Sequence, residues 1–599
     1  MAQTPPVWDL GDLYSGIDDP DIDTVLDEQM KRADAFAEKY RNKIDCADLK
    51  AEALNGAISE YEGLYQAADK PIDFASLYFS MDTGDPARGA FLQKMRECYS
   101  QISIKLMFFD LELMALPDEC LSKIIDYPAL DRYRHYIGVV RKFREHHLSE
   151  PEEKIMEEKA NTGRRSFTRL FEETVSNITF HVAGDTEKKP MSMSEILALL
   201  HDPDREVRRN AAAGFTEGLK ANGRTLTFIF NTILQDKATD DRLRKYEFPE
   251  QGRHLSNELD NDTVELAVSV AVESSDVVAR YYKLKKEILG FDKLTHYDRY
   301  APLFDTKEVV EFDHAKQIIL GAFDKFHPIL AESAAKFFDE EWIDAEPRKG
   351  KRGGAYCSYI TPDLHPYVFM NYLNRMDDVM TLGHELGHGV HAYLSRPKGY
   401  LNFSTVLPVA ELASTFGEML VFEALQAEAS LEDKLALYAG KIEGSFATIQ
   451  RQAAMYRFEQ AIHKHRREKG ELTIEDFSGY WQTVQQAMFG DSVELGEEHS
   501  GWWMYVSHFI NSPFYVYAYT FGELLVMALY SMYREQGAAF SPKYVELLST
   551  GGSMAPIDML LKVGIDVHDP EFWKGGMKVL DGLIDDFEAL YREYKVSKL

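Results

Sequence analysis

The alternation of apolar and charged positions along the chain predicts a mostly α-helical protein. Long stretches rich in Leu, Ala, Glu and Lys repeat apolar residues every three or four positions, the period of an amphipathic helix. One helix start is marked by Ser192 and Glu195, the two ends of a capping box, followed by an apolar run. β-prone residues are rarer. They form a patch at 174–182, which predicts a hairpin, and a short run at 351–360.

The chain offers few places at which to divide it into domains. With 599 residues, length alone would allow about four. No Ser/Gly-rich or Pro-rich linker, low-complexity segment or internal repeat separates blocks of sequence. We therefore predict an N-terminal helical region over residues 1–195 and a second, larger helical domain over residues 196–599.

One motif in the second domain contains residue types that are suited to binding a metal ion. His384-Glu385-Leu386-Gly387-His388 has the H-E-x-x-H pattern and lies in a stretch of helical texture. On an α-helix, residues four apart project from the same face, so the two imidazoles can be aimed at one point. Two neutral imidazoles suit Zn²⁺, and Glu385 is placed to act as general base on an attacking water. A helix with two ordinary histidines is the alternative reading of the motif alone.

A catalytic zinc site needs a third protein ligand, with a fourth position left for water. The next helical segment, 408–418, supplies a candidate in Glu411, which follows His384 by 27 residues. That spacing allows one helix to end and a second to pack beside it, so Glu411 is the predicted third ligand. Glu418 lies seven residues further on the same helical face. It either holds an imidazole N–H or is an ordinary solvated carboxylate.

His391 lies on the first helix, three residues beyond His388. A longer H-E-x-x-H-x-x-G-x-x-H pattern would place a third histidine at position 394, which is Leu394. That ligand arrangement is excluded, and His391 is predicted to pack or to support a ligand rather than to bind metal.

Three glycines, at positions 383, 387 and 389, interrupt the motif helix. Each should cost about 0.5–1 kcal/mol of helix stability relative to Ala. Close approach of a second backbone, a substrate or a metal ligand would explain them, and so would tight packing of two helices.

The charge balance narrows the choice of partners. The chain has 67 basic and 98 acidic residues, a net charge of −31. No basic block could neutralise phosphates, so nucleic-acid binding is not expected, and the acidity disfavours anionic membrane surfaces. Neither a long apolar run nor a signal-peptide pattern occurs. The four cysteines are too few and too scattered for a disulfide framework. Together these features predict a cytoplasmic, soluble enzyme.

At four places the sequence resembles the thimet oligopeptidase–oligoendopeptidase F family of zinc peptidases, most closely its oligoendopeptidase F branch. The stretches are Trp8–Tyr14, Gly354–Cys357, Asp377–His391 with Glu411–Ser414, and His508–Tyr519. The resemblance implies a gluzincin-type helical body with a deep central cleft and a small β-sheet beside the catalytic helix. It also implies one Zn²⁺ per chain, held by His384, His388 and Glu411.

The resemblance further implies a set of hydrogen-bond donors. In the family, a His and two or more Tyr from the last of these stretches stabilise the oxyanion that forms during peptide hydrolysis. Carried over, these residues are His508, Tyr515 and Tyr519, with the two tyrosines on one helical face and Tyr517 pointing away. An aromatic packing stripe is the alternative. The spacing between His508 and the tyrosines also leaves open which tyrosines act, with a possible shift of two residues along the chain.

The β-prone run that precedes the motif has a possible role of its own. Residues 354–360 could form an exposed edge strand that pairs with an extended peptide through backbone hydrogen bonds. An ordinary hairpin is the alternative.

These observations predict a zinc metallo-endopeptidase that uses Glu385 as general base and acts on short peptides, a size limit implied by the family. A zinc carboxypeptidase that trims peptide ends is a second possibility. An aminopeptidase is disfavoured because the Gly-x-Met-Glu-Asn stretch of that class is missing. A non-catalytic peptide-binding scaffold with structural zinc fits poorly, since a structural site has no use for Glu385. The sequence does not indicate an oligomeric state.

Overall fold

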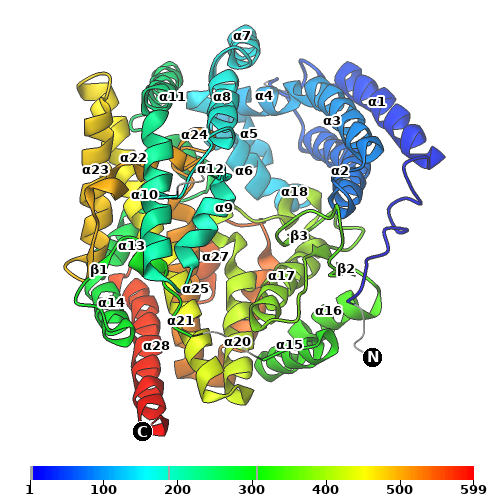
Figure 1. Cartoon of the computed structure of the whole chain (residues 1–599). Helices are drawn as coiled ribbons and strands as arrows, with labels where there is room; N and C mark the ends of the chain where they lie inside the picture. The colour runs from blue at the N-terminus through cyan, green and yellow to red at the C-terminus, as the bar shows by residue number, and fades with distance from the viewer. Residues whose placement is uncertain (1–4, 47, 186–188, 305–307, 599) are drawn as a thin grey trace. The chain divides into compact units, whose positions relative to one another are not determined.

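The computed structural model describes residues 5–598 except 47, 186–188 and 305–307. The predicted α-helical class is confirmed, because helices follow one another along almost the whole described chain (Figure 1). Strands within the described residues are only two or three residues long. The capping box of Ser192 and Glu195 is formed as predicted. The predicted hairpin at 174–182 is wrong: a helix runs on to Ser176, and among the residues described here the pairing that follows is an isolated bridge between Phe180 and Met191.

By its contacts, the chain forms two compact units, each made of three separated segments. The first unit contains residues 1–144, 308–428 and 532–566, and the second contains 145–307, 429–531 and 567–599. The two units are described separately. The domain boundary near residue 195 remains a prediction.

The first unit contains the motif helix. Its helices are α1 (Pro20–Tyr40), α2 (Ala51–Met81), α3 (Pro86–Leu106), α4 (Phe108–Ala115), α5 (Asp118–Ile124), α6 (Arg134–Lys142), α15 (Phe312–Phe326), α16 (Pro328–Asp339), α17 (Met376–Ser395), α18 (Tyr400–Phe403), α19 (Leu407–Ala410), α20 (Leu412–Glu428), α26 (Ser541–Thr550) and α27 (Pro556–Lys562).

A three-stranded sheet in the first unit lies next to α17 (Figure 1). Its strands are β2 (Ile343–Asp344), β3 (Tyr356–Ser358) and β4 (Tyr367–Phe369), in the order β2-β4-β3. β2 runs parallel to β4, and β3 runs antiparallel to it with Cys357 opposite Val368. β3 is therefore an edge strand, and the small sheet expected beside the motif helix is confirmed.

The second unit is also helical. Its helices are α7 (Glu150–Ala160), α8 (Arg164–Ser176), α9 (Met193–Ala198), α10 (Arg205–Ala221), α11 (Gly223–Leu243), α12 (Gln251–Ser256), α13 (Asn261–Glu273), α14 (Ser275–Leu289), α21 (Leu431–Thr448), α22 (Gln450–Glu468), α23 (Ile474–Phe489), α24 (His508–Asn511), α28 (Pro570–Ser597) and most of α25 (Tyr517–Gln536). A parallel pair, β1 (Leu294–Thr295) and β5 (Val493–Glu494), completes it.

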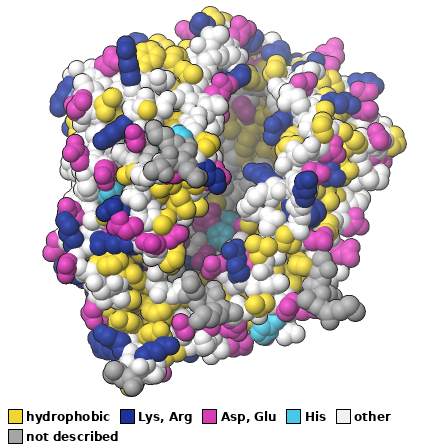
Figure 2. All heavy atoms as spheres, viewed as in Figure 1, with side chains coloured by type: hydrophobic (Ala, Val, Ile, Leu, Met, Phe, Trp, Pro, Cys, Tyr) yellow, Lys and Arg dark blue, Asp and Glu magenta, His cyan; other side chains and the backbone are white. Residues whose placement is uncertain are grey.

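Charged side chains of both signs lie on the surface. On the face shown in Figure 2, Lys and Arg side chains are interspersed with Asp and Glu. Among the described residues, no helix combines the length and the apolar character that crossing a membrane requires.

Candidate metal centre and active site

The motif helix α17 has a well-defined beginning. The carboxylate of Asp378 accepts hydrogen bonds from the backbone N–H groups of Leu373 (2.8 Å) and Arg375 (2.9 Å). These bonds satisfy donors that a helix start leaves without partners inside the helix. Asp377, by contrast, is exposed. Two turns after this cap, His384 and His388 emerge on one face of the helix, with their ring centroids 5.1 Å apart.

The glycines of α17 allow neighbouring helices to approach it closely. A Cβ atom at Gly387 would lie 2.4 Å from the carbonyl oxygen of Ala413 on α20, and one at Gly383 would lie 2.7 Å from Val421. On another side of α17, a Cβ at Gly389 would lie 2.4 Å from the Phe337 ring of α16. Helix–helix packing therefore explains all three glycines, and it brings α20 against the face that carries the histidines.

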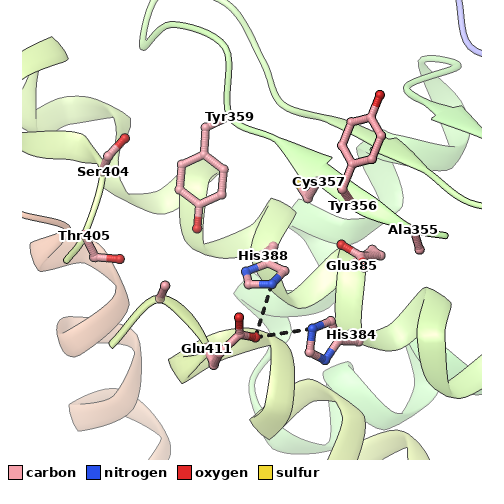
Figure 3. Close-up of a pocket in the computed structure, with 11 residues that line it drawn as sticks. Ala355, Tyr356, Cys357, Tyr359, His384, Glu385, His388, Ser404, Thr405 and Glu411 are labelled. Carbon is pink, nitrogen blue, oxygen red and sulfur yellow. Dashed lines mark ion pairs between the residues drawn. The ribbon is translucent and has the colours of Figure 1, made fainter. Parts of the chain in front are cut away.

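The predicted ligands lie together in one cluster. One carboxylate oxygen of Glu411, Oε2, is 3.3 Å from Nε2 of His384 and 3.3 Å from Nε2 of His388 (Figure 3). The three side chains offer one donor atom each, all within 4.8 Å of one another. Two imidazole nitrogens and a carboxylate oxygen are a donor set that Zn²⁺ accepts.

Glu411 is positioned by a break in the helix rather than by a continuous one. It follows α19 and immediately precedes α20, at the turn between them. The hydroxyl of Ser414, in the first turn of α20, donates a 2.6 Å hydrogen bond to Oε2 of Glu411. This bond fixes the carboxylate rotamer toward the two histidines.

Glu418 supports the cluster from one turn further along α20. Its Oε2 is 3.2 Å from Nδ1 of His384, the ring nitrogen that does not face Glu411. A carboxylate on the outer nitrogen keeps the proton there and leaves Nε2 as a lone-pair donor. Two roles were expected for Glu418, and the structure supports the one in which its carboxylate accepts a hydrogen bond from the His384 imidazole.

The protonation of the cluster agrees with a cation site. Burial alone would lower the pKa of His384, but hydrogen bonds to Glu411 and Glu418 raise it to about 10. Burial raises the pKa of Glu411, and the two histidines more than reverse this and hold it well below its usual range. The cluster therefore favours positive charge between its carboxylates, which a divalent cation can supply in place of a proton.

Glu385 has a different environment from the other acidic residues of the site. It is 6% exposed, and its Oε2 has no hydrogen-bond partner among the described residues. Burial raises the pKa of its carboxyl, although His384 and His388 oppose the shift. A carboxylate with a free acceptor oxygen and a raised pKa suits a general base.

A cavity of about 370 Å³ opens in front of the cluster. His384, Glu385, His388 and Glu411 form its floor, and the edge strand β3 runs along one side (Figure 3). The other lining residues are Ala355, Tyr356, Cys357, Tyr359, Ser404, Thr405 and Ala410. Tyr359, Ser404 and Thr405 were not among the predicted site residues. Tyr359 lies in the β-prone run singled out above, whereas nothing in the sequence marks Ser404 or Thr405.

The wall formed by Ser404 and Thr405 is held by contacts from distant parts of the first unit. The carbonyl of Asn402 accepts a 2.8 Å hydrogen bond from the N–H of Gly552, and its side-chain amide donates to the carbonyl of Arg132 (2.7 Å). A Cβ at Gly552 would lie 2.1 Å from the carbonyl oxygen of Ser404. Only glycine allows this approach.

Helix α26 supports α20. The Tyr544 hydroxyl of α26 donates a 2.6 Å hydrogen bond to the carbonyl of Leu412, the residue after Glu411. The Tyr544 ring also stacks on Phe416, with centroids 4.2 Å apart. Both contacts fix the beginning of α20, where Glu411 is attached.

His391 is not part of the ligand cluster. It is 1% exposed, and neither ring nitrogen has a hydrogen-bond partner among the described residues. Burial lowers the pKa of His391 to about 3, so the ring is neutral. The structure thus supports the predicted packing role.

His508, Tyr515 and Tyr519 form a cluster within the second unit. The hydroxyl of Tyr519 lies 3.5 Å from Nε2 of His508, and the ring centroids of the two tyrosines are 5.2 Å apart. The expectation that both tyrosines share a helical face is wrong in detail, because Tyr515 precedes α25 and only Tyr519 is within it. Tyr517 points elsewhere, as predicted: its buried hydroxyl bonds to Asn257 (2.7 Å).

Comparison with known proteins relates this chain to a family of peptidases. The model of peptidase family M3 matches residues 198–579, and a model described as oligopeptidase F matches residues 112–180. Oligopeptidase PepF of Bacillus subtilis (strain 168) is 29% identical over 575 residues, which cover 93% of this chain and 84% of the relative.

Solved structures share the fold. A crystal structure from Chlamydophila abortus, 22% identical, has a TM-score of 0.87 and covers 98% of this chain and 100% of its own. The oligoendopeptidase-F of Enterococcus faecium, 21% identical, has a TM-score of 0.71 and covers 95% of this chain and 98% of its own. The match to the M3 model covers more than half of the 599 residues. The chain therefore belongs to peptidase family M3, and its resemblance to the oligoendopeptidase F branch is confirmed.

Proposed function

We propose that this member of peptidase family M3 is a zinc-dependent endopeptidase that hydrolyses internal bonds of short peptides. One observation carries the proposal: a His384–His388–Glu411 cluster lies in a cavity together with Glu385, a buried carboxylate that has a free oxygen. A purely structural metal site would need neither the cavity nor Glu385.

His384, His388 and Glu411 would hold one Zn²⁺, with Glu418 and Ser414 fixing the orientation of His384 and Glu411. When bound there, Zn²⁺ supplies Lewis acidity, which polarises the peptide carbonyl and lowers the pKa of water. Three protein ligands leave a coordination position for substrate or water, as a catalytic site requires.

Glu385 moves the protons of the reaction. The attacking water loses a proton to its carboxylate as the new C–O bond forms at the peptide carbonyl. The carboxylic acid then passes that proton to the leaving nitrogen when the C–N bond breaks. The raised pKa of Glu385 favours both steps, because a carboxylate with a lower pKa would bind the proton too weakly to keep it between them.

The edge strand β3 provides a place for the substrate backbone. Within the described part of the chain, β4 is the one strand that pairs with β3, and Tyr356 and Cys357 line the cavity. An extended peptide added to the free edge would be held through backbone hydrogen bonds, which do not depend on side-chain identity. This arrangement suits a peptidase of broad sequence preference.

His508, Tyr515 and Tyr519 are proposed donors to the oxyanion that develops on the peptide carbonyl. The resemblance to the family supports this role, and so does the mutual packing of the three side chains. Burial lowers the pKa of His508, so its ring is neutral near pH 7 and offers one N–H donor.

The test uses an internally quenched peptide of about ten residues, blocked at both termini, with metal-loaded, chelated and zinc-restored protein. Cleavage at an internal bond that the chelator abolishes and Zn²⁺ restores is expected, with products identified by mass spectrometry. Restoration by Zn²⁺ is compared with Co²⁺ and Mn²⁺, since first-row metals compete for such sites. Trimming of free-ended peptide without cleavage of the blocked one would make the protein a carboxypeptidase instead.

A further inference from the structure

Tyr359 follows directly after β3 and lines the same cavity as His384, His388 and Glu411. Cys357, within β3, and Tyr359, just beyond its end, both line the cavity. In Figure 3 the Tyr359 ring crosses the cavity, and its hydroxyl is directed toward the side where His388 and Glu411 lie. The hydroxyl of Tyr356 is directed away from the cluster.

The backbone after Tyr359 is strained. Ile360 has φ of 57°, in the left-handed region that a β-branched residue rarely adopts, and its side chain is 7% exposed. Such strain persists only where the surrounding structure imposes it. The turn ends β3 abruptly at the cavity, and the position of Tyr359 is part of that turn.

The Tyr359 hydroxyl is available to a ligand. Its ring packs at a centroid distance of 6.0 Å from Phe403, but the hydroxyl makes no hydrogen bond with any described residue. Burial raises the pKa of Tyr359, and Cys357, Glu411 and Glu385 add to the shift, so the hydroxyl is protonated near pH 7. A half-buried donor that faces a cavity and has no partner among the described residues is ready to bond with whatever enters.

We propose that Tyr359 is a catalytic residue whose hydroxyl donates a hydrogen bond to the oxyanion formed at the scissile carbonyl. This inference rests on the proposed peptidase function. Tyr359 belongs to the same compact unit as His384, His388 and Glu411, so that unit alone sets its position relative to the ligands. A preorganised donor of this kind acts most strongly on the charged transition state.

The test is Tyr359→Phe in the full-length, metal-loaded protein, assayed with the blocked quenched peptide. The variant keeps the ring that packs on Phe403 and removes only the hydroxyl. We expect kcat to fall about 100-fold while KM changes by less than about threefold. Metal content and melting temperature should equal those of the unmodified protein. Tyr393→Phe is the matched control, because that ring packs under Arg396 and does not line the cavity.

A second readout separates catalysis from structure. A peptide with a phosphinate in place of the scissile amide mimics the tetrahedral oxyanion, so its Ki should rise by about the same factor as kcat falls. A variant that loses metal, raises only KM or turns over like the unmodified protein would overturn the role of Tyr359. If the unmodified protein itself does not cleave the peptide, the proposed function fails before Tyr359 is tested.

Discussion

Two glutamates in this site lie close to the same histidines, and their surroundings differ in burial and hydrogen bonding. Glu411 accepts a hydrogen bond from Ser414 and shares one oxygen between two imidazoles. Glu385 is more deeply buried and keeps one oxygen without a partner among the described residues. The first environment favours a permanently charged ligand and the second a carboxylate that can gain and lose a proton.

Glu385→Gln tests this division of roles. The amide has nearly the shape of the carboxylate but cannot accept the proton, so kcat should fall by about 10²–10⁴-fold while bound zinc is retained. Metal content is measured by elemental analysis alongside turnover. Glu423→Gln is the control, because Glu423 on α20 is paired with Arg534 of α25 and lies outside the cavity. Loss of zinc from Glu385→Gln would show that Glu385 has a ligand role instead.

The tyrosines of the second unit offer an internal comparison. Tyr515→Phe and Tyr519→Phe should each lower kcat by about 10-fold or more with metal retained, if their hydroxyls contact the oxyanion. Tyr517→Phe should instead lower the melting temperature and leave kcat nearly unchanged, because its buried hydroxyl bonds to Asn257. Wild-type turnover in both of the first two variants would make the cluster a packing feature.

The sequence predicts the His384–His388–Glu411 cluster better than the cavity around it. His384 and His388 follow from helical spacing alone, and Glu411 follows from the need for a third ligand on an adjacent helix. The direction of Tyr359 could not be predicted, because it depends on a left-handed conformation at Ile360 that its side chain disfavours. Nor does the sequence mark Ser404 and Thr405, since their segment is held by hydrogen bonds of Asn402 with Gly552 and Arg132, which are far away in the chain.

At the scale of elements, the site depends on how closely α17 and α20 approach each other. The period of apolar residues predicts the helices themselves. It does not show whether the three glycines of α17 serve helix packing or the approach of a substrate or ligand. The structure shows that Gly387 lies against the backbone of Ala413 and Ser414 near the beginning of α20, two and three residues after Glu411. A side chain at position 387 must therefore push away the beginning of α20, which directly follows Glu411.

Gly387→Ala should therefore weaken the metal site rather than stabilise the helix. The new Cβ would lie 2.4 Å from the Ala413 carbonyl oxygen, so α20 must shift, and we expect zinc affinity to fall by about 10-fold or more. Gly321→Ala on α15 is the matched control, because its Cβ would meet nothing within 4 Å. It should stabilise the protein by about 0.5–1 kcal/mol. Zinc titration and thermal unfolding of both variants distinguish the two effects.

At the scale of the whole molecule, buried neutral histidines make stability depend on pH. Burial lowers the pKa of His254 and of His296 to about 4, and Arg299 adds to the shift of His296. An unfolded histidine has a pKa near 6.5, so the unfolded chain binds more protons between about pH 6.5 and 4. Stability is therefore highest above pH 6.5 and declines as the pH falls toward 4.

His296→Phe should flatten this dependence. The phenyl ring can keep the edge contact with Trp502, whose ring centroid is 5.5 Å away, but cannot take up a proton. Between pH 7 and 5.5 the wild-type protein should lose about 1 kcal/mol more stability than the variant. Calorimetry with excess zinc measures the difference, and His314→Gln is the control because that histidine is 48% exposed. Equal slopes for wild type and His296→Phe would rule out His296 as a source of the dependence.

The sequence could not predict which segments make up each of the two units. Apolar period, caps and motifs report on neighbours within a few residues, whereas each unit is assembled from three segments that are far apart in the chain. The first unit is complete only when residues 532–566 join residues 1–144 and 308–428.

This interrupted layout has a consequence for the order of events during synthesis. A ribosome delivers His384, His388 and Glu411 well before it delivers Tyr544 and Gly552, which lie in roughly the last tenth of the chain. Until then α20 lacks the hydrogen bond from Tyr544 to Leu412, and Asn402 lacks the one from Gly552. The growing polypeptide thus carries His384, His388 and Glu411 early, but the contacts that support their surroundings can form only when translation is almost finished.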